Sequence, residues 1–155
     1  MFLINLCRNL NLKKIPYCVV GGTAVALHGA VRGTLDVDLA IALSEETFIE
    51  TEKVLRAMGL ESRLPVRAQE VFHFRKEYIT RRNLIAWSFL NPTNPAQQVD
   101  IIITEDANDL SPVTLKLHGT KVRVASVEGL IRMKQKSSRP QDIEDIQALQ
   151  ELKKR

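Results

Sequence analysis

Two stretches decide the fold that this sequence predicts: Val19-Val20-Gly21-Gly22-Thr23-Ala24 and Arg32-Gly33-Thr34-Leu35-Asp36-Val37-Asp38-Leu39. Together they are typical of a strand, a double-glycine turn, a short helix and a second strand that carries two carboxylates. Side chains two residues apart on a strand point to the same face, so Asp36 and Asp38 share a face with their Cα atoms about 6–7 Å apart. Two neighbouring acids resist ionisation unless a cation lies between them, and a hard divalent ion with oxygen ligands suits this arrangement.

The double glycine predicts a place for an anion beside these acids. Gly21 and Gly22 follow an apolar strand that ends at Val20, and glycine permits backbone angles closed to other residues. Thr23 is predicted to cap a helix from Ala24 to about Val31. A helix N-terminus behind a glycine turn presents free N–H groups and the positive end of the helix dipole, which attract phosphate.

A third acid, Asp100, lies within the apolar run from Val99 to Thr104. This run and the run from Leu84 to Leu90 are joined by a turn-rich loop, which suits an antiparallel pair of strands. An aspartate in such a run is costly to bury without a partner. Asp100 is either an edge acid that faces water or a third carboxylate beside Asp36 and Asp38, and the apolar run around it favours the second.

The sequence leaves two possible roles open for each of two cationic residues, Lys134 and Arg32. Lys134 falls in the middle of an apolar helix face, so it either extends to the surface along its methylene stem or points into the acidic site towards a carboxylate or phosphate. Arg32 either grips a phosphate or neutralises one of the paired acids. Asp142, on the final helix, is predicted to pair with Lys134 or with Arg139 in a structural role.

The remaining chain predicts alternating helices and strands. We expect helices over 1–12 and after Ser44 as far as Gly59, a strand over 35–43, and a strand over 71–74. A hairpin is expected around His118-Gly119, followed by a helix capped by Ser126 and a final helix with Pro140 near its start. In the final helix, Ile143, Ile146 and Leu149 are predicted to form the buried stripe.

The bulk properties predict one domain over residues 1–155, with a core over about 13–125 and C-terminal helices over about 126–155. The 155 residues are 45% hydrophobic and carry a net charge of +4, which is compatible with an anionic substrate. No apolar run approaches the ~20 residues that a membrane span needs, and two cysteines make no disulfide framework. We therefore expect a cytoplasmic protein.

Three strand-borne acids beside a glycine turn suit two-metal phosphoryl-type transfer. The turn would hold a triphosphate, metal ions on Asp36 and Asp38 would polarise the reacting phosphorus, and the third carboxylate would activate an attacking hydroxyl.

At these residues the sequence resembles the nucleotidyltransferase superfamily of DNA polymerase beta and kanamycin nucleotidyltransferase. Within it, the chain is most similar to small bacterial proteins related to the abortive-infection type IV toxin nucleotidyltransferases. The likeness includes His28-Gly29 before the Arg-x-Thr-x-Asp-x-Asp segment. It also includes the C-terminal segments Leu130-Ile131-Arg132-Met133-Lys134 and Arg139-Pro140-Gln141-Asp142-Ile143-Glu144-Asp145.

The resemblance implies an α/β (α+β) fold with a mixed β-sheet flanked by helices. It implies Mg²⁺, or Mn²⁺, at Asp36 and Asp38, with Asp100 as the third carboxylate. It also implies transfer of a nucleoside monophosphate from a nucleoside triphosphate such as ATP to an acceptor hydroxyl on RNA (tRNA included), a protein or a small molecule. A toxin of this kind would have an antitoxin partner. Gly21, Gly22, Thr23, Arg32 and Lys134 are the candidate residues for binding the nucleotide.

Two other hypotheses compete with the enzyme. The chain could be a non-catalytic nucleotide-binding or regulatory module of the same fold, although such a module has no need of Asp100. It could also bind nucleic acid through the basic segment 63–82, but that segment lacks interleaved aromatic residues and reads more simply as a solvated edge.

Overall fold

The computed structural model describes residues 1–29, 36–137 and 139–154. Its strands are β1 (Tyr17–Val20), β2 (Val37–Ile41), β3 (Glu61–Ser62), β4 (Ala86–Leu90), β5 (Gln98–Asp106), β6 (Val113–Leu117) and β7 (Thr120–Val124). Its helices are α1 (Phe2–Leu12), α2 (Gly21–Leu27), α3 (Glu45–Ala57), α4 (Ala68–His73), α5 (Arg75–Arg82), the 3-10 helix η1 (Ala107–Leu110), α6 (Val127–Ser137) and α7 (Pro140–Lys153).

The strands of the described ranges form one mixed sheet in the order β3-β4-β5-β2-β1-β7-β6. Strand β2 runs antiparallel to β1 and parallel to β5, while β4 and β5 form the predicted antiparallel pair. Strand β5 is paired on both sides, which confirms that the run around Asp100 is an interior strand. The mixed sheet with flanking helices is the predicted fold class.

One face of the sheet carries the apolar core. Phe48 of α3 stacks on Trp87 of β4 with ring centroids 6.0 Å apart, and Trp87 pairs in register with Ile101 of β5. Leu39 of β2 is the register partner of Ile101 on the other side, and all of these side chains are fully buried. Helix α3 therefore covers the face of Leu39 and Ile101, and residues at alternate positions, such as Asp38 and Asp100, point to the opposite face.

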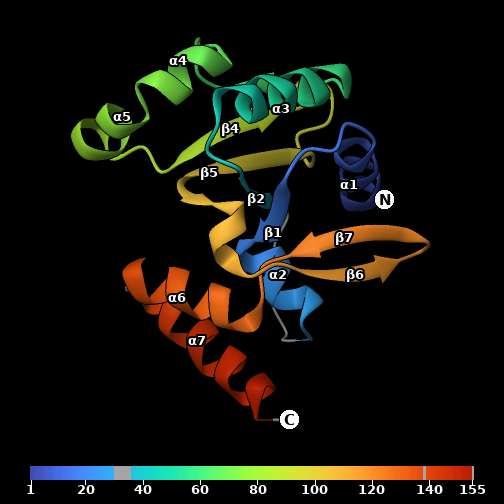
Figure 1. The fold of residues 1–155 in the computed structure, drawn as a ribbon, viewed down its shortest axis with the longest axis vertical. Helices are drawn as coiled ribbons and strands as arrows, with labels where there is room; N and C mark the ends of the chain where they lie inside the picture. The colour runs from blue at the N-terminus through green and yellow to red at the C-terminus, as the bar shows by residue number, and fades with distance from the viewer. Residues whose placement is uncertain (30–35, 138, 155) are drawn as a thin grey trace.

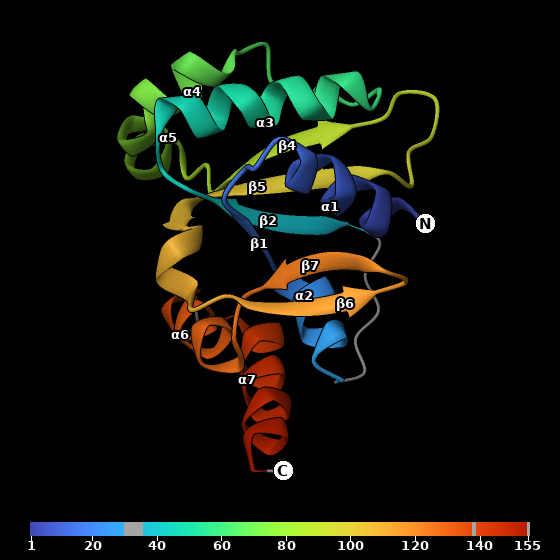
Figure 2. The same cartoon turned by 45° about the vertical axis from the view of Figure 1, so that its right-hand side comes forward.

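Two groups of helices lie at opposite ends of the molecule as it is drawn in Figure 1. Helices α3, α4 and α5 lie beside β4 and β5, whereas α6 and α7 lie at the other end, below α2 and the β6–β7 hairpin. The turned view in Figure 2 shows the same separation. None of the helices in the described parts of the chain has the length and apolar character that crossing a membrane requires.

Two predicted elements were wrong. Residues 71–74 lie in and just after helix α4, in which the side chain of Glu70 returns to the backbone N–H of Arg67 and begins the helix. A short apolar run does not distinguish a strand from a buried helical turn. In α7 the predicted stripe fails at Ile143, which is 54% exposed, because Asp142 and Asp145 occupy the buried side together with Leu149.

Two arginines of the basic segment 63–82 form hydrogen bonds to other parts of the fold. The guanidinium of Arg67 donates to the buried carboxylate of Glu52 at 3.2 Å, and that of Arg75 donates to the carbonyl oxygen of Ile103 at 2.8 Å. These two arginines link α3 to α4 and α5 to β5.

Candidate functional site

Asp38 and Asp100 lie side by side in the centre of the sheet. They are register partners across the parallel strands β2 and β5, whose backbones are about 4.8 Å apart. Register partners project to the same face, so the two carboxyl groups lie next to each other. The structure therefore brings together two of the three predicted acids, whose positions in the sequence are far apart.

The glycine turn lies directly against the Asp38 carboxylate. Gly21 follows Val20, the register partner of Asp38 on β1, and has a φ of +67°. A Cβ atom at Gly21 would overlap the Oδ2 atom of Asp38. Glycine is therefore required here twice, once for the left-handed backbone and once for the close approach of the carboxylate.

Burial and acidic neighbours raise the pKa values of Asp38 and Asp36. The pKa of Asp38 is raised to about 7, chiefly by burial. Interactions with Asp100 and the charge of Asp36 raise it further, whereas the charge of Lys134 lowers it. Burial, followed by the charge of Asp100, raises the pKa of Asp36, while Arg63 lowers it. Like charges held this close disfavour ionisation, and a bound cation would reverse that effect.

Asp36 lies at the bend just before β2 and is tied to α2 by Thr23. The Thr23 hydroxyl donates to the carbonyl oxygen of Asp36 at 3.0 Å. The prediction that Thr23 caps a helix beginning at Ala24 was wrong, because the helix begins at Gly21 with Val20 as its N-cap and ends at Leu27. Thr23 instead holds the start of β2 against the glycine turn, and its predicted contact with phosphate stays a prediction.

Lys134 is buried between α6 and α7. Its Nζ atom lies 2.9 Å from Asp145 Oδ2 and 3.5 Å from Asp142 Oδ1. Asp142 also accepts from the Arg139 guanidinium at 2.9 Å, so the predicted pairing of Asp142 is confirmed with both partners. The hydrogen bond to Asp142 is the main cause that raises the pKa of Arg139, and the charge of Asp38 raises it further.

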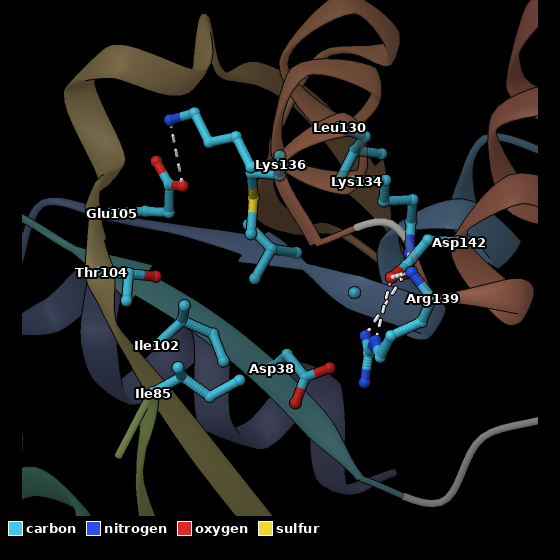
Figure 3. Close-up of a pocket in the computed structure, with 13 residues that line it drawn as sticks. Asp38, Ile85, Ile102, Thr104, Glu105, Leu130, Lys134, Lys136, Arg139 and Asp142 are labelled. Atoms are coloured by element: carbon cyan, nitrogen blue, oxygen red, sulfur yellow. Dashed lines mark hydrogen bonds and ion pairs between the residues drawn. The ribbon is translucent and has the colours of Figure 1, made fainter. Parts of the chain in front are cut away.

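A cavity of about 420 Å³ opens from Asp38 towards α6 (Figure 3). Strands β1, β2 and β5 supply its floor, α6 supplies one wall, and the start of α7 supplies Arg139 and Asp142. Gly21, Asp38 and Lys134 all line it, so three of the predicted site residues face one space. The lining residues are Val20, Gly21, Asp38, Ile85, Ile102, Thr104, Glu105, Leu130, Met133, Lys134, Lys136, Arg139 and Asp142.

The structure adds site residues that the sequence reasoning missed. Gln98 donates to Asp100 Oδ1 at 3.1 Å, and strand alternation two residues before Asp100 is the signal that could have found it. The charge of Arg63 lowers the pKa of Asp36, and no local pattern in the sequence indicates that the two residues lie near each other. Arg32 lies outside the residues that the structure describes, so its two readings stay predictions.

Comparisons with known proteins identify the family and the fold of this chain. The family DUF6036, described as "Nucleotidyltransferase of unknown function", matches residues 3–154. An antigenic nucleotidyltransferase-like protein from Paracoccidioides brasiliensis is 21% identical with a TM-score of 0.59, over 95% of this chain and 72% of that one. No curated protein sequence matches this chain significantly.

The antibiotic-resistance factor ANT(2'')-Ia has a similar structure. Its solution structure is 16% identical with a TM-score of 0.61, over 95% of this chain and 80% of that one. The structure of its complex with adenylyl-2''-tobramycin is 15% identical with a TM-score of 0.57, over 93% of this chain and 83% of that one. At such identities the likeness shows a shared fold. The family match spans nearly the whole sequence, and it shows that the chain belongs to this nucleotidyltransferase family.

Proposed function

We propose that this chain moves a nucleoside monophosphate from a nucleoside triphosphate to an acceptor hydroxyl in a reaction that depends on Mg²⁺ or Mn²⁺. The observation that carries the proposal is the register pairing of Asp38 with Asp100 on the same face of the sheet. A half-buried pair of acids against a glycine backbone destabilises the metal-free fold, and a bound cation would offset that cost.

The donor set fits magnesium. Within residues 1–29, 36–137 and 139–154, no three His, Cys, Asp or Glu side chains are gathered closely enough to hold a metal by themselves. Magnesium is usually bound through one or two carboxylates and the phosphates of the substrate, so Asp38 and Asp100 suffice as a core, and the role of Asp36 as a further ligand stays a prediction. A magnesium ion bound here would offset the negative charge of the triphosphate and polarise the α-phosphorus.

In the transfer itself, Asp100 receives the proton of the acceptor hydroxyl. The hydroxyl oxygen then forms a bond to the α-phosphorus, and the bond between that phosphorus and the bridging oxygen breaks, so pyrophosphate leaves with the electron pair. Gln98, which donates to Asp100 Oδ1, holds that carboxylate in place. Asp38, on the neighbouring strand, would hold the metal ion that offsets the charge of the α-phosphate.

The phosphates are proposed to lie along the glycine turn. Gly21 has no side chain there, so a phosphate can approach the backbone of Gly21 and Gly22 beside Asp38. Lys134 and Arg139 add positive charge on the other side of the cavity. Their pairing with Asp142 fixes the position of both cations before the substrate binds.

The acceptor is proposed to be a hydroxyl of an RNA, a protein or a small molecule. The ANT(2'')-Ia complex contains adenylyl-2''-tobramycin, which illustrates a small-molecule acceptor on this fold. The resemblance to abortive-infection toxins adds the hypothesis of a toxin with an antitoxin partner. Its test is growth arrest on expression of the wild-type chain, with Asp38→Asn expected to remove the arrest.

The direct test is turnover of each labelled nucleoside triphosphate with Mg²⁺, measured as pyrophosphate release. We expect release by the wild type, a loss of at least about a thousandfold in Asp38→Asn and Asp100→Asn, and an unchanged rate in Asp109→Asn, which removes an exposed acid. Metal-dependent nucleotide binding without any pyrophosphate release would instead indicate the non-catalytic module.

A further inference from the structure

The cavity beside Asp38 lies on the donor side of the proposed reaction. Asp38 lines it and Asp100 does not, although the two are neighbours in the sheet. Under the proposed function Asp100 receives the proton of the acceptor, so the acceptor approaches from the far side of the carboxylate pair. The cavity is therefore left for the nucleoside of the triphosphate.

The far end of the cavity carries an ion pair. Thr104 and Glu105 follow Asp100 along β5, which advances about 3.3 Å per residue, so Glu105 lies roughly 16 Å further along the strand. The Glu105 side chain is only 12% exposed, and its Oε1 atom lies 3.5 Å from Nζ of Lys136, whose side chain is 70% exposed. Figure 3 shows the pair at the end of the cavity opposite to Asp38 and Arg139.

Apolar side chains lie between the ion pair and Asp38. Ile102 of β5 and Met133 of α6 line the cavity together with Ile85, which comes just before β4. Ile85 is 54% exposed and lies on the wall of the cavity. Such walls accept the flat faces of an aromatic ring, and the charged pair is left to contact the edge of that ring.

We propose that this cavity binds the base of the triphosphate and that Glu105 and Lys136 select guanine; the inference rests on the proposed function. The edge of guanine presents a carbonyl oxygen next to two adjacent N–H donors. The Glu105 carboxylate accepts from both donors, and the Lys136 ammonium donates to the carbonyl oxygen. The carboxylate thus faces the two donors of the guanine edge, and the ammonium faces the neighbouring carbonyl oxygen.

The other bases match less well. Adenine and cytosine each place an amino donor next to a ring nitrogen that accepts, so one carboxylate oxygen would face a lone pair. Uracil has a single N–H between two carbonyl oxygens. An ionised carboxylate has no proton to offer to such acceptors, and a mismatched polar group inside a partly buried site lowers affinity.

The test compares the four nucleoside triphosphates and inosine triphosphate, which lacks the amino group of guanine, with wild type, Glu105→Gln and Lys136→Met. Both turnover and binding of non-hydrolysable analogues with Mg²⁺, followed by the shift in Tm, are measured. We expect the wild type to prefer GTP and to use ITP less well. Glu105→Gln is expected to lower kcat/KM for GTP by about tenfold to a hundredfold.

The same glutamine should raise the use of ATP, because a carboxamide pairs with adenine through one donor and one acceptor. If Glu105 had only a structural role, Glu105→Gln would lower kcat/KM for GTP and for ATP together. Lys136→Met changes an exposed side chain and should also reduce the preference for GTP. Glu144→Gln on the outer face of α7 is the matched control and should leave the preference unchanged.

Equal use of all bases by the wild type, or an unchanged preference in Glu105→Gln, would overturn the guanine assignment while the proposed function stands. Failure of every triphosphate to release pyrophosphate would overturn the proposed function. In that case a preference for the GTP analogue in binding, lost in Glu105→Gln, would still support base selection at this cavity, and equal binding would overturn it.

Discussion

Replacing Asp38 with asparagine should change how the stability of the metal-free protein depends on pH. The pKa of Asp38 is raised in the folded chain to about 7 by burial and by its acidic neighbours. Because the folded state holds this proton more tightly than the unfolded state, it binds more protons between about pH 4 and pH 7. The free energy of unfolding of the wild type therefore falls as pH rises through this window.

The magnitude follows from the two pKa values. The usual value of 3.8 and the folded value of about 7 differ by about three pKa units. Each pKa unit corresponds to about 1.4 kcal/mol, so ionising Asp38 lowers the free energy of unfolding by up to about 4 kcal/mol above pH 7. Asparagine has no proton to lose. We expect the two proteins to be similar below about pH 4 and the variant to be more stable at about pH 8.

The chain contains its own reporter for this measurement. Trp87 is the sole tryptophan and is fully buried against Phe48 and Phe89, so its fluorescence follows loss of the core. Urea unfolding with a chelator present, repeated from acidic to mildly alkaline pH, gives the free energy of unfolding for wild type and variant. Titrations of groups far from Asp38 cancel in the difference between the two proteins.

Adding Mg²⁺ completes the experiment. We expect Mg²⁺ to stabilise the wild type at about pH 8, where Asp38 is ionised, and to have little effect on Asp38→Asn. A difference in free energy that stays constant across the pH range would refute the argument that Asp38 is held against its neighbours. Equal stabilisation of both proteins by Mg²⁺ would refute its assignment as a metal ligand.

Two further predictions concern the glycine turn and the helix pair. Gly21→Ala and Gly119→Ala both force an alanine into a left-handed backbone, so urea unfolding should show that each costs about 1–2 kcal/mol. Pyrophosphate release should be abolished by Gly21→Ala alone. The Cβ atom added at Gly21 displaces the Asp38 carboxylate, whereas a Cβ atom at Gly119 meets open space. Equal activity of the two variants would contradict that close approach. Lys134→Met removes the buried cation between Asp142 and Asp145 and should lower the free energy of unfolding by about 3–5 kcal/mol, against a negligible change for the exposed Lys53→Met. A small effect of Lys134→Met in the same urea assay would show that α6 and α7 do not depend on this pair.

Local patterns predicted much of the fold because the physics behind them is local. The Ser44 hydroxyl accepts from the backbone N–H of Thr47, and Gly59 follows the end of the same helix with a φ of +88°. Ser126 likewise accepts from the N–H of Gly129. Caps and turns of this kind involve residues within four positions of each other, so the sequence encodes them directly.

The errors arose where tertiary contacts override local preference. Ile143 is exposed because the buried Lys134 requires acids on the facing side of α7. Thr23 does not cap a helix because Gly21 already turns the chain out of β1, and its hydroxyl is used to hold Asp36. A helix periodicity identifies a stripe, but the partner that packs on it decides which side is buried.

By itself, the sequence determined that Asp38 lies on a strand behind a double glycine and that Asp100 lies in an apolar interior strand. These features depend on the period of two and on the conformational freedom of glycine. The sequence also placed Asp36 on the strand of Asp38, whereas β2 begins at Val37 and Asp36 lies at the bend before it. Only the tertiary structure decided that Asp38 pairs in register with Asp100, that its carboxylate rests on Gly21, and that Glu105 and Lys136 close the far end of the same cavity. Register between distant strands and the packing of α6 on the sheet depend on burial of the whole core, which no local pattern encodes.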